Sequence, residues 1–285
     1  FQVLMLERLA ELQRALEDYA TEGALVARAL DLAQQHDLGD SIRWRLQVQA
    51  LESAFARGEL DRVERDYARY AAGFDREHAL RASYVRAKML IEQQRFDEAQ
   101  QAFDGLFAGL AEVDDPLFRH TVHNSHGILL RRLGKVDEAV AAYRRSLTFL
   151  DPVRLEHQEA LLTVPGNIAI AYGAAGRYAE SDVEFRTLLE RAQAQLGAEH
   201  PQMAVIARNY VTLLHRTGRF QSAAALVERF HSASARSDDR LARIGFLQAQ
   251  ASAALYAGDD AGALEAAIAC TELAIAVHGA GSPAL

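Results

Sequence analysis

Three histidines have the residue type and spacing that could support metal chemistry. His120, His123 and His126 fall within the stretch HTVHNSH of the 285-residue chain. On a helix, positions i, i+3 and i+6 lie within an arc of about 120°, so two of these side chains could share a metal ion and the third could just reach it. No Asp or Cys completes a ligand set in this segment. We therefore predict that the three histidines pack between helices and that no metal site forms.

The sequence lacks the other common signatures of catalysis and cofactor binding. It contains no GxxxxGK[ST] phosphate loop, no HExxH, no paired CxxC and no GxSxG turn. The single cysteine, Cys270, stands where a helical core would need a small side chain, so we interpret it as a packed thiol rather than a nucleophile. The sequence therefore predicts a protein that is not an enzyme and that has no cofactor.

Composition and charge exclude several kinds of partner. The formal net charge is −8, which argues against general binding of nucleic acid through its phosphates. No apolar run approaches the ~20 residues that span a bilayer, so no membrane partner is expected. A lone cysteine cannot form an internal disulfide, and no secretory signal pattern is present. These features predict a cytoplasmic location.

One pattern recurs along the chain and must position any functional residue. An apolar helix is followed by a turn residue, then by an apolar or aromatic residue two positions on, and by a small residue three positions later. Successive turn residues are 36, 40, 42, 42 and 40 positions apart, and a weaker unit covers residues 17–30. The turn residues are Gly58, Gln94, Gly134, Gly176, Gly218 and Gly258. A fixed period of this length indicates stacked helix pairs.

Small or medium-sized residues recur on both sides of each turn. Five positions after the turn stand Val63, Ala99, Ala139, Ser181, Ala223 and Ala263. Seven positions before it stand Leu51, Ala87, Gly127, Ala169, Val211 and Ala251. Mostly small side chains at both places predict that the two helices of each pair pack closely.

A repeated phrase marks the junction between units. LGAEHP at residues 196–201 resembles HGAGSP at 278–283, and Pro201 and Pro283 each follow a glycine four positions upstream. Proline is well suited to the first turn of a helix. We therefore expect Pro201 to begin a helix, and the chain to continue into another helix or repeat after residue 278. The alternative is that residues 279–285 are a frayed terminus.

Aromatic and small residues at fixed positions resemble the tetratricopeptide-repeat family, and specifically its kinesin-light-chain-like bacterial subclass. Tyr172, Tyr178, Ser181 and Phe185 occupy positions 11, 17, 20 and 24 of one unit, and another unit has Phe96, Ala99 and Phe103 at the last three of these positions. Position 27 departs from the family pattern, because it holds bulky residues such as Leu188 where the pattern has small ones.

This resemblance implies an all-α fold, a right-handed superhelical solenoid of about seven antiparallel helix pairs that forms a single array over residues 1–285. The expected units are residues 1–38, 41–75, 78–113, 118–153, 160–197, 201–235 and 238–278.

In the family, positions 2, 5, 6, 9, 12 and 13 of each unit face a concave groove. Asn at position 6 holds the backbone of a ligand, and a basic residue at position 13 holds a carboxylate. Asn167 and Asn209 are 42 residues apart and share one place on successive helices. Ala174 at position 13 and Ser125 at position 6 depart from this clamp. The resemblance implies a groove lined by Tyr84, Lys88, Thr121, Asn124, Arg131, Arg132, Asn167, Arg208, Asn209, Thr212, His215 and Arg216.

The predicted function is that of a scaffold that binds a protein or peptide, such as an acidic segment, as the sensing or interaction arm of a larger bacterial regulatory protein. One alternative is a scaffold that regulates an adjacent catalytic domain of the same chain, a kinase, protease or ATPase. Another is a receptor for a peptide pheromone. The groove residues also admit a simpler interpretation as polar residues on a solvated helix face. We interpret the charge runs DDRLAR (238–243) and ERDYARY (64–70) as solvated helix faces.

Overall fold

The computed structural model describes residues 1–16, 18–235 and 240–278 of the chain. Within these ranges the chain forms fourteen α-helices and two short 3₁₀ helices, and it contains no strand. The prediction of an all-α fold is confirmed. The chain divides into two compact units, Phe1–Leu133 and Gly134–Leu285, and each unit is described by itself.

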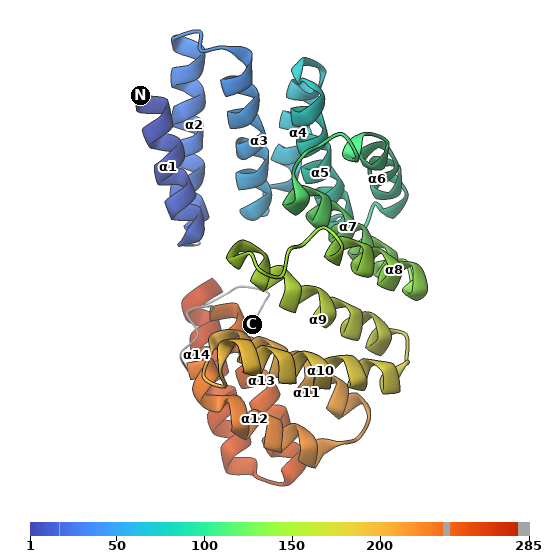
Figure 1. Cartoon of the computed structure of the whole chain (residues 1–285). Helices are drawn as coiled ribbons and strands as arrows, with labels where there is room; N and C mark the ends of the chain where they lie inside the picture. Colours follow the sequence, from blue (N-terminus) through green and yellow to red (C-terminus); the bar gives the residue numbers. More distant parts are fainter. Residues whose placement is uncertain (17, 236–239, 279–285) are drawn as a thin grey trace. The chain divides into compact units, whose positions relative to one another are not determined.

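Unit 1 contains seven α-helices, and helices that follow one another in the sequence pack side by side (Figure 1). Their bounds are α1 Gln2–Ala15, α2 Tyr19–Gln35, α3 Asp40–Ala56, α4 Leu60–Tyr70, η1 Ala71–Gly73, α5 Arg76–Glu92, α6 Phe96–Leu110 and α7 Pro116–Arg132. Its largest core joins helices α3 to α7 around buried side chains such as Phe103, Leu51 and Met89.

Unit 2 contains the other seven α-helices of the described chain. Their bounds are α8 Val136–Leu147, η2 Leu155–His157, α9 Gln158–Ala174, α10 Tyr178–Leu196, α11 Pro201–Arg216, α12 Phe220–Ala235, α13 Arg240–Ala257 and α14 Asp260–His278. Its core joins helices α9 to α13 and includes Phe185, Phe230 and Phe246. In neither unit does any described helix combine the length and the apolar character needed to cross a bilayer.

The turn residues predicted from the sequence adopt left-handed backbone geometry. Gly58, Gly134, Gly176, Gly218 and Gly258 have φ between 71° and 78°, and Gln94 has φ of 59°. After several of these turns the next N–H donates to the carbonyl five residues earlier, as Arg177 N does to Tyr172 O at 2.9 Å. This bond pattern ends a helix by satisfying carbonyls that its last turn leaves unpaired. Backbone geometry therefore favours glycine at these positions.

Gln94 is the non-glycine member of this set, so replacing it with glycine should stabilise the protein. Its side chain is exposed, and a side chain at positive φ costs about 1–2 kcal/mol, part of which glycine gives back through its greater freedom in the unfolded chain. We expect Gln94→Gly to raise the free energy of unfolding by about 0.5–1 kcal/mol in denaturant titrations. Gly176→Ala should lower it, and the same sign for both variants would contradict the argument.

The small residues on either side of each turn are buried, as predicted, except in the last pair. Four of them are fully buried: Ala99, Ala139, Ser181 and Ala223. In the last pair, Ala251 and Ala263 are only half-buried. The Ser181 hydroxyl donates to the carbonyl of Ala169 across the helix pair at 2.7 Å. Residues from the two predicted positions therefore meet.

Proline begins a helix at the repeated junction. α10 ends at Leu196, Gly197 follows with φ of 82°, and Pro201 is the first residue of α11. Pro116 begins α7 in the same way. The expected role of Pro201 is confirmed. The expectation that the chain continues after residue 278 falls on residues 279–285, which lie outside the described residues.

An arginine directly after three of the turns joins neighbouring repeats. Arg95 pairs with Glu64 of α4 at 2.8 Å, Arg177 with Asp137 of α8 at 2.5 Å, and Arg219 with Asp182 of α10 at 2.6 Å. Each partner lies on the second helix of the preceding pair. Exposed ion pairs contribute roughly 0–1 kcal/mol each to stability. These three ion pairs therefore favour one register between neighbouring repeats more than they stabilise the fold.

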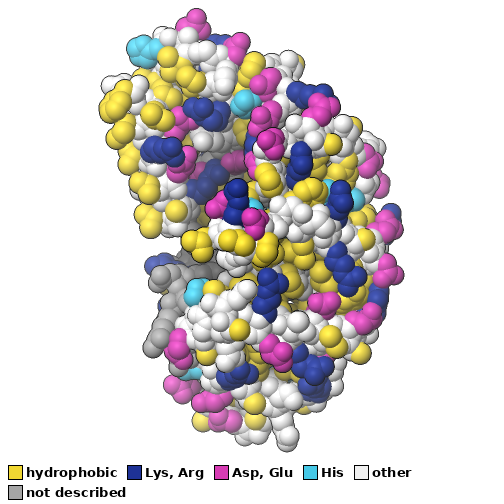
Figure 2. All heavy atoms as spheres, in the orientation of Figure 1, with side chains coloured by type: hydrophobic (Ala, Val, Ile, Leu, Met, Phe, Trp, Pro, Cys, Tyr) yellow, Lys and Arg dark blue, Asp and Glu magenta, His cyan; other side chains and the backbone are white. Residues whose placement is uncertain are grey.

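On the face shown in Figure 2, acidic and basic side chains are interspersed.

Candidate functional site

The clearest candidate site is an opening of about 510 Å³ between α11 and α13 in unit 2. Five of the residues predicted for the groove line it together: Arg208, Asn209, Thr212, His215 and Arg216. The other lining residues are Val211, Gly245, Gln248, Ala249 and Ser252. Helices α11 and α13 are the first helices of their pairs, which is where the family pattern places a groove.

The spacing of these residues along α11 explains why they meet. Positions 208, 212 and 215 differ by four and three residues, so their side chains lie on one face of the helix. Gly245 on α13 completes the wall because a Cβ there would lie 2.5 Å from Cδ of Arg208. The glycine therefore leaves room for the arginine to cross between the two helices.

The opening is cationic within an acidic protein. None of its ten lining residues is Asp or Glu. Arg208 Nη2 donates to Asn209 Oδ1 at 3.2 Å, and Arg216 Nη1 donates to the Gly173 carbonyl at 3.3 Å. Neither guanidinium forms an ion pair with a carboxylate of the described residues. Both positive charges are therefore available to an anionic partner.

His215 contributes a neutral ring to this wall. Its centroid lies 5.3 Å from that of Tyr256 and 5.9 Å from that of Phe220, and these two rings stack on each other. Nε2 is buried and has no hydrogen-bond partner among the described residues. Burial lowers the pKa of His215, so its imidazole is neutral near pH 7. The positive charge of the opening therefore comes from Arg208 and Arg216.

Tyr84 and Lys88 lie on α5, in unit 1. The Tyr84 side chain is 8 % exposed, its hydroxyl shares a 2.9 Å hydrogen bond with Ser125, and burial raises its pKa to about 12. The Lys88 ammonium lies 4.2 Å from the Phe55 ring centroid, and burial lowers its pKa. Tyr84 thus packs inside unit 1, in contrast to the exposed groove position expected from the repeat register, because its hydroxyl finds Ser125 on the next first helix.

The predicted residues of α7 and α9 make mostly internal contacts. Thr121 Oγ1 donates to the Leu117 carbonyl at 2.6 Å, and Arg132 pairs with Glu92 at 3.1 Å. Three further predicted residues are half-buried: Asn124, Arg131 and Asn167. None of the α5, α7 and α9 residues lines the α11–α13 opening. Their role in binding remains a prediction.

The three histidines of α7 pack against aromatic rings. His123 lies 5.0 Å from Phe107, His126 lies 5.2 Å from Phe103 and 5.0 Å from Phe107, and His120 is buried. Over the residues that the structure describes, no group of three or more His, Cys, Asp or Glu is arranged to hold a metal ion. These contacts agree with the packing role that the sequence predicts.

We expect chelation to leave the protein unchanged. Structural metal sites supply folding free energy, so removing a bound metal lowers the melting temperature. Because His123 and His126 pack on phenylalanine rings, treatment with EDTA should not shift the melting curve measured by circular dichroism. Stoichiometric zinc in the purified protein, measured by atomic emission, would overturn this expectation.

Cys270 occupies a packed position on α14. It is half-buried, and its thiol lies 3.7 Å from the carbonyl of Ile244. Burial raises the pKa of this thiol, which leaves it protonated near pH 7. An activated nucleophile needs the opposite shift, so the environment of Cys270 is that of a core residue.

Comparison with known proteins identifies the repeat. Residues 157–233 match the model of the tetratricopeptide repeat family. No curated protein matches the chain. The chain is similar to a tetratricopeptide repeat protein from Parabacteroides merdae, with TM-score 0.62, 14% identity, and coverage of 95% of this chain and 93% of that one.

Two further solved structures belong to the same comparison. BtubC (BKLC) from P. vanneervenii is 16% identical with TM-score 0.58, covering 84% of this chain and 94% of that one. The kinesin-light-chain-like repeats of Podosopora anserina are 19% identical with TM-score 0.56, covering 69% of this chain and 97% of that one. At these identities the likeness concerns the fold.

Proposed function

We propose that the chain is a scaffold that binds an anionic protein or peptide segment in the α11–α13 groove. The premise is that residues 157–233 match the tetratricopeptide repeat family and that the chain has the fold of tetratricopeptide-repeat proteins. Repeats of this family generally mediate contacts between proteins. The observation that carries the finer proposal is the convergence of Arg208, Asn209 and Arg216 on one opening that has no carboxylate in its wall.

The chemistry of these side chains suits an acidic peptide. An asparagine amide offers a donor and an acceptor to a peptide backbone, and an arginine fork matches the two oxygens of a carboxylate. An opening of about 510 Å³ lies within the usual range of ligand pockets, so it fits a few side chains of an extended segment. Several arginines elsewhere in unit 2 pair with acids, as Arg186 does with Asp182 at 3.0 Å. The groove arginines differ from these in sharing one opening whose lining has no Asp or Glu.

The proposed context is the sensing or interaction arm of a larger bacterial regulatory protein in the cytoplasm. Two other contexts use the same groove, namely docking of an adjacent catalytic domain of the same chain and capture of a peptide pheromone. We propose binding rather than catalysis because the groove holds no activated nucleophile and no acid–base pair. An acidic ligand added in trans should bind in each of these contexts, whereas a tethered domain would weaken that binding in the longer chain.

The test is a binding measurement by fluorescence anisotropy. The probes are short fluorescein-labelled peptides rich in Asp and Glu, with matched peptides that carry Asn and Gln instead. We expect the acidic peptides alone to bind, with an affinity that falls as salt is added. Asn209→Ala should weaken binding about threefold to tenfold, which corresponds to one hydrogen bond of about 0.5–1.5 kcal/mol.

A matched variant removes an amide from the same unit without touching the groove. Gln221 is exposed on α12 and does not line the opening, so Gln221→Ala should bind like wild type. Equal binding of acidic and amide peptides would contradict an anionic ligand. Equal binding by Asn209→Ala and Gln221→Ala would contradict the groove as its place.

A further inference from the structure

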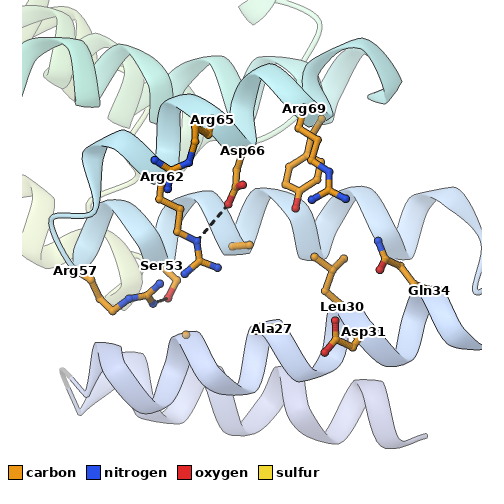
Figure 3. A pocket seen from close by; sticks show the side chains of 13 residues that line it. Ala27, Leu30, Asp31, Gln34, Ser53, Arg57, Arg62, Arg65, Asp66 and Arg69 are labelled. Carbon is orange, nitrogen blue, oxygen red and sulfur yellow. Dashed lines mark hydrogen bonds and ion pairs between the residues drawn. The ribbon is translucent and has the colours of Figure 1, made fainter.

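A second opening, of about 300 Å³, lies in unit 1 between α2 and α4 with α3 as its floor. Four arginines line it: Arg57, Arg62, Arg65 and Arg69 (Figure 3). Figure 3 shows Arg62 and Arg69 reaching from α4 toward α2, where Asp31 and Gln34 stand opposite. It is built on different helices from the groove of α11 and α13, and it goes beyond the proposed function.

Two of the four arginines are already neutralised. Arg57 Nε and Nη2 donate to the two carboxylate oxygens of Glu59 at 2.8 and 3.1 Å. Arg62 donates to Glu59 at 3.1 Å and to Asp66 at 3.3 Å. The hydrogen bonds from Arg57 lower the pKa of Glu59 to about 2, so this acceptor stays charged at any physiological pH. Arg57 and Arg62 therefore form a wall of the opening that is held in place by these carboxylates.

Arg57 is also fixed against the backbone of α2. Its Nη1 donates to the Tyr19 carbonyl at 3.2 Å and to the Ser53 hydroxyl at 2.5 Å. A Cβ at Gly23 would lie 1.9 Å from Nη1 of Arg57, so only glycine lets the guanidinium lie on the helix at this point. This end of the opening is thus constructed around the arginine, unlike a chance gap between surface side chains.

The remaining pair, Arg65 and Arg69, has no carboxylate partner among the described residues. They are four residues apart on α4, so their charges share one helix face, where like charges repel. The Arg69 guanidinium lies 5.7 Å from the Tyr70 ring centroid. The side chains of Arg65 and Arg69 are both exposed. Asp31 faces them from α2 but forms no ion pair with either. This face of α4 therefore has two arginines that form no ion pair among the described residues, opposite the single carboxylate of Asp31.

We propose that this opening binds a phosphate monoester, held by the guanidiniums of Arg65 and Arg69 against the wall that Arg57 and Arg62 form. A phosphate monoester has a charge of about −1.5 to −2 near pH 7, which matches two unpaired arginines, and its oxygens accept the paired donors of a guanidinium fork. An opening of about 300 Å³ holds the phosphate and a short part of its carrier. Asp31 repels an anion at the α2 side, and Asp66 of α4 is paired with Arg62 at 3.3 Å, so the phosphate lies toward Arg65 and Arg69.

The experiment measures binding and melting temperature at low ionic strength with defined probes. These are inorganic phosphate, adenosine monophosphate, and a short peptide that has phosphoserine, serine or glutamate at one position. We expect wild type to bind the phosphorylated peptide at least about tenfold more tightly than the serine peptide, which is the effect of a charge-assisted hydrogen bond. Phosphate should also raise the melting temperature.

Arg65→Gln/Arg69→Gln should abolish the preference for phosphate and leave the melting temperature without ligand unchanged, because neither side chain forms an ion pair. Arg8→Gln/Arg28→Gln is the control for lost charge, since it removes two exposed arginines of unit 1 that do not line the opening; Arg8 pairs with Glu11 at 2.7 Å, whereas Arg28 has no ion pair among the described residues. Equal loss in both double variants, or no preference for the phosphopeptide in wild type, would overturn the proposal. Tighter binding of phosphopeptide than of inorganic phosphate would support the site and assign its ligand to a protein segment. Tighter binding of the nucleotide would support it and assign a small molecule.

Discussion

Replacing Phe185 with alanine is expected to lower the free energy of unfolding of unit 2 by about 3–5 kcal/mol. Phe185 lies on α10, is 2 % exposed, and stacks on Tyr210 of α11 with centroids 5.3 Å apart and an angle of 18° between the rings. Alanine removes the ring and leaves a cavity between two helix pairs. It also removes the stacking partner that positions Tyr210, whose hydroxyl donates to Asp182 at 2.6 Å. The loss therefore affects both a core and a contact between repeats.

Urea titration followed by circular dichroism measures this loss. Val183 lies on the same helix and is 54% exposed, so Val183→Ala should change the free energy of unfolding by less than about 0.5 kcal/mol. In a repeat array, stability depends on each repeat and its neighbours, so the midpoint of the unit 2 transition should shift more than that of unit 1. Similar small shifts for Phe185→Ala and Val183→Ala would show that the α10–α11 contact is not a major source of stability.

The turns and the buried seam could be predicted from the sequence because they depend on local rules. Gly176 is required by its positive φ, and Ser181 by the close approach of a neighbouring helix, whatever the rest of the chain does. Gln94 was identified as a turn residue by its spacing alone, and its φ of 59° confirms that spacing outweighs residue type there. The groove cluster on α11 was also predictable, because helical periodicity places Arg208, Thr212 and His215 on one face.

The environment of each side chain could not be predicted in the same way. The register of the repeat places Tyr84 in the groove, but its hydroxyl is satisfied by Ser125, 41 residues away, and the ring is buried. Lys88 lies near Glu52, which itself pairs with Arg14 at 2.8 Å. Such contacts depend on how long side chains reach across three helices, and no spacing in the sequence encodes that reach.

The charge run ERDYARY (64–70) on α4 of unit 1 shows the same limit. Arg65 and Arg69 are exposed, in agreement with the solvated face that the sequence predicts, and with Asp66 and Tyr70 they also line an opening against α2. The missing information was the position of α2, which turns one flank of α4 into a wall. A signal was present in the spacing of Arg62, Arg65 and Arg69, which places three arginines on one face of the helix. The run DDRLAR lies partly outside the described residues.

Reversing the charge of Arg216 is expected to weaken binding of an acidic peptide in the α11–α13 groove by about ten- to a hundredfold, or roughly 1.5–3 kcal/mol. Arg216 has no carboxylate partner among the described residues, so its charge is available to an anionic ligand. Glutamate removes the guanidinium donors and adds a like charge beside the ligand. Because association is steered by this charge, most of the salt dependence of binding should also disappear. Arg216→Gln should give a smaller loss, since it removes the charge without reversing it.

The control must separate a local contact from the net charge of the protein. Arg191 is exposed on α10, has no ion pair with a described residue, and does not line the groove. Arg191→Glu therefore changes the net charge by the same amount and should alter affinity only slightly at physiological salt, where charges beyond about 8 Å are screened. Circular dichroism must first show that all three variants fold, because the Arg216 guanidinium also donates to the Gly173 carbonyl at 3.3 Å. If Arg191→Glu weakened binding as much as Arg216→Glu, the affinity for the acidic peptide would depend on the overall charge of the protein, and the groove between α11 and α13 would not be its binding site.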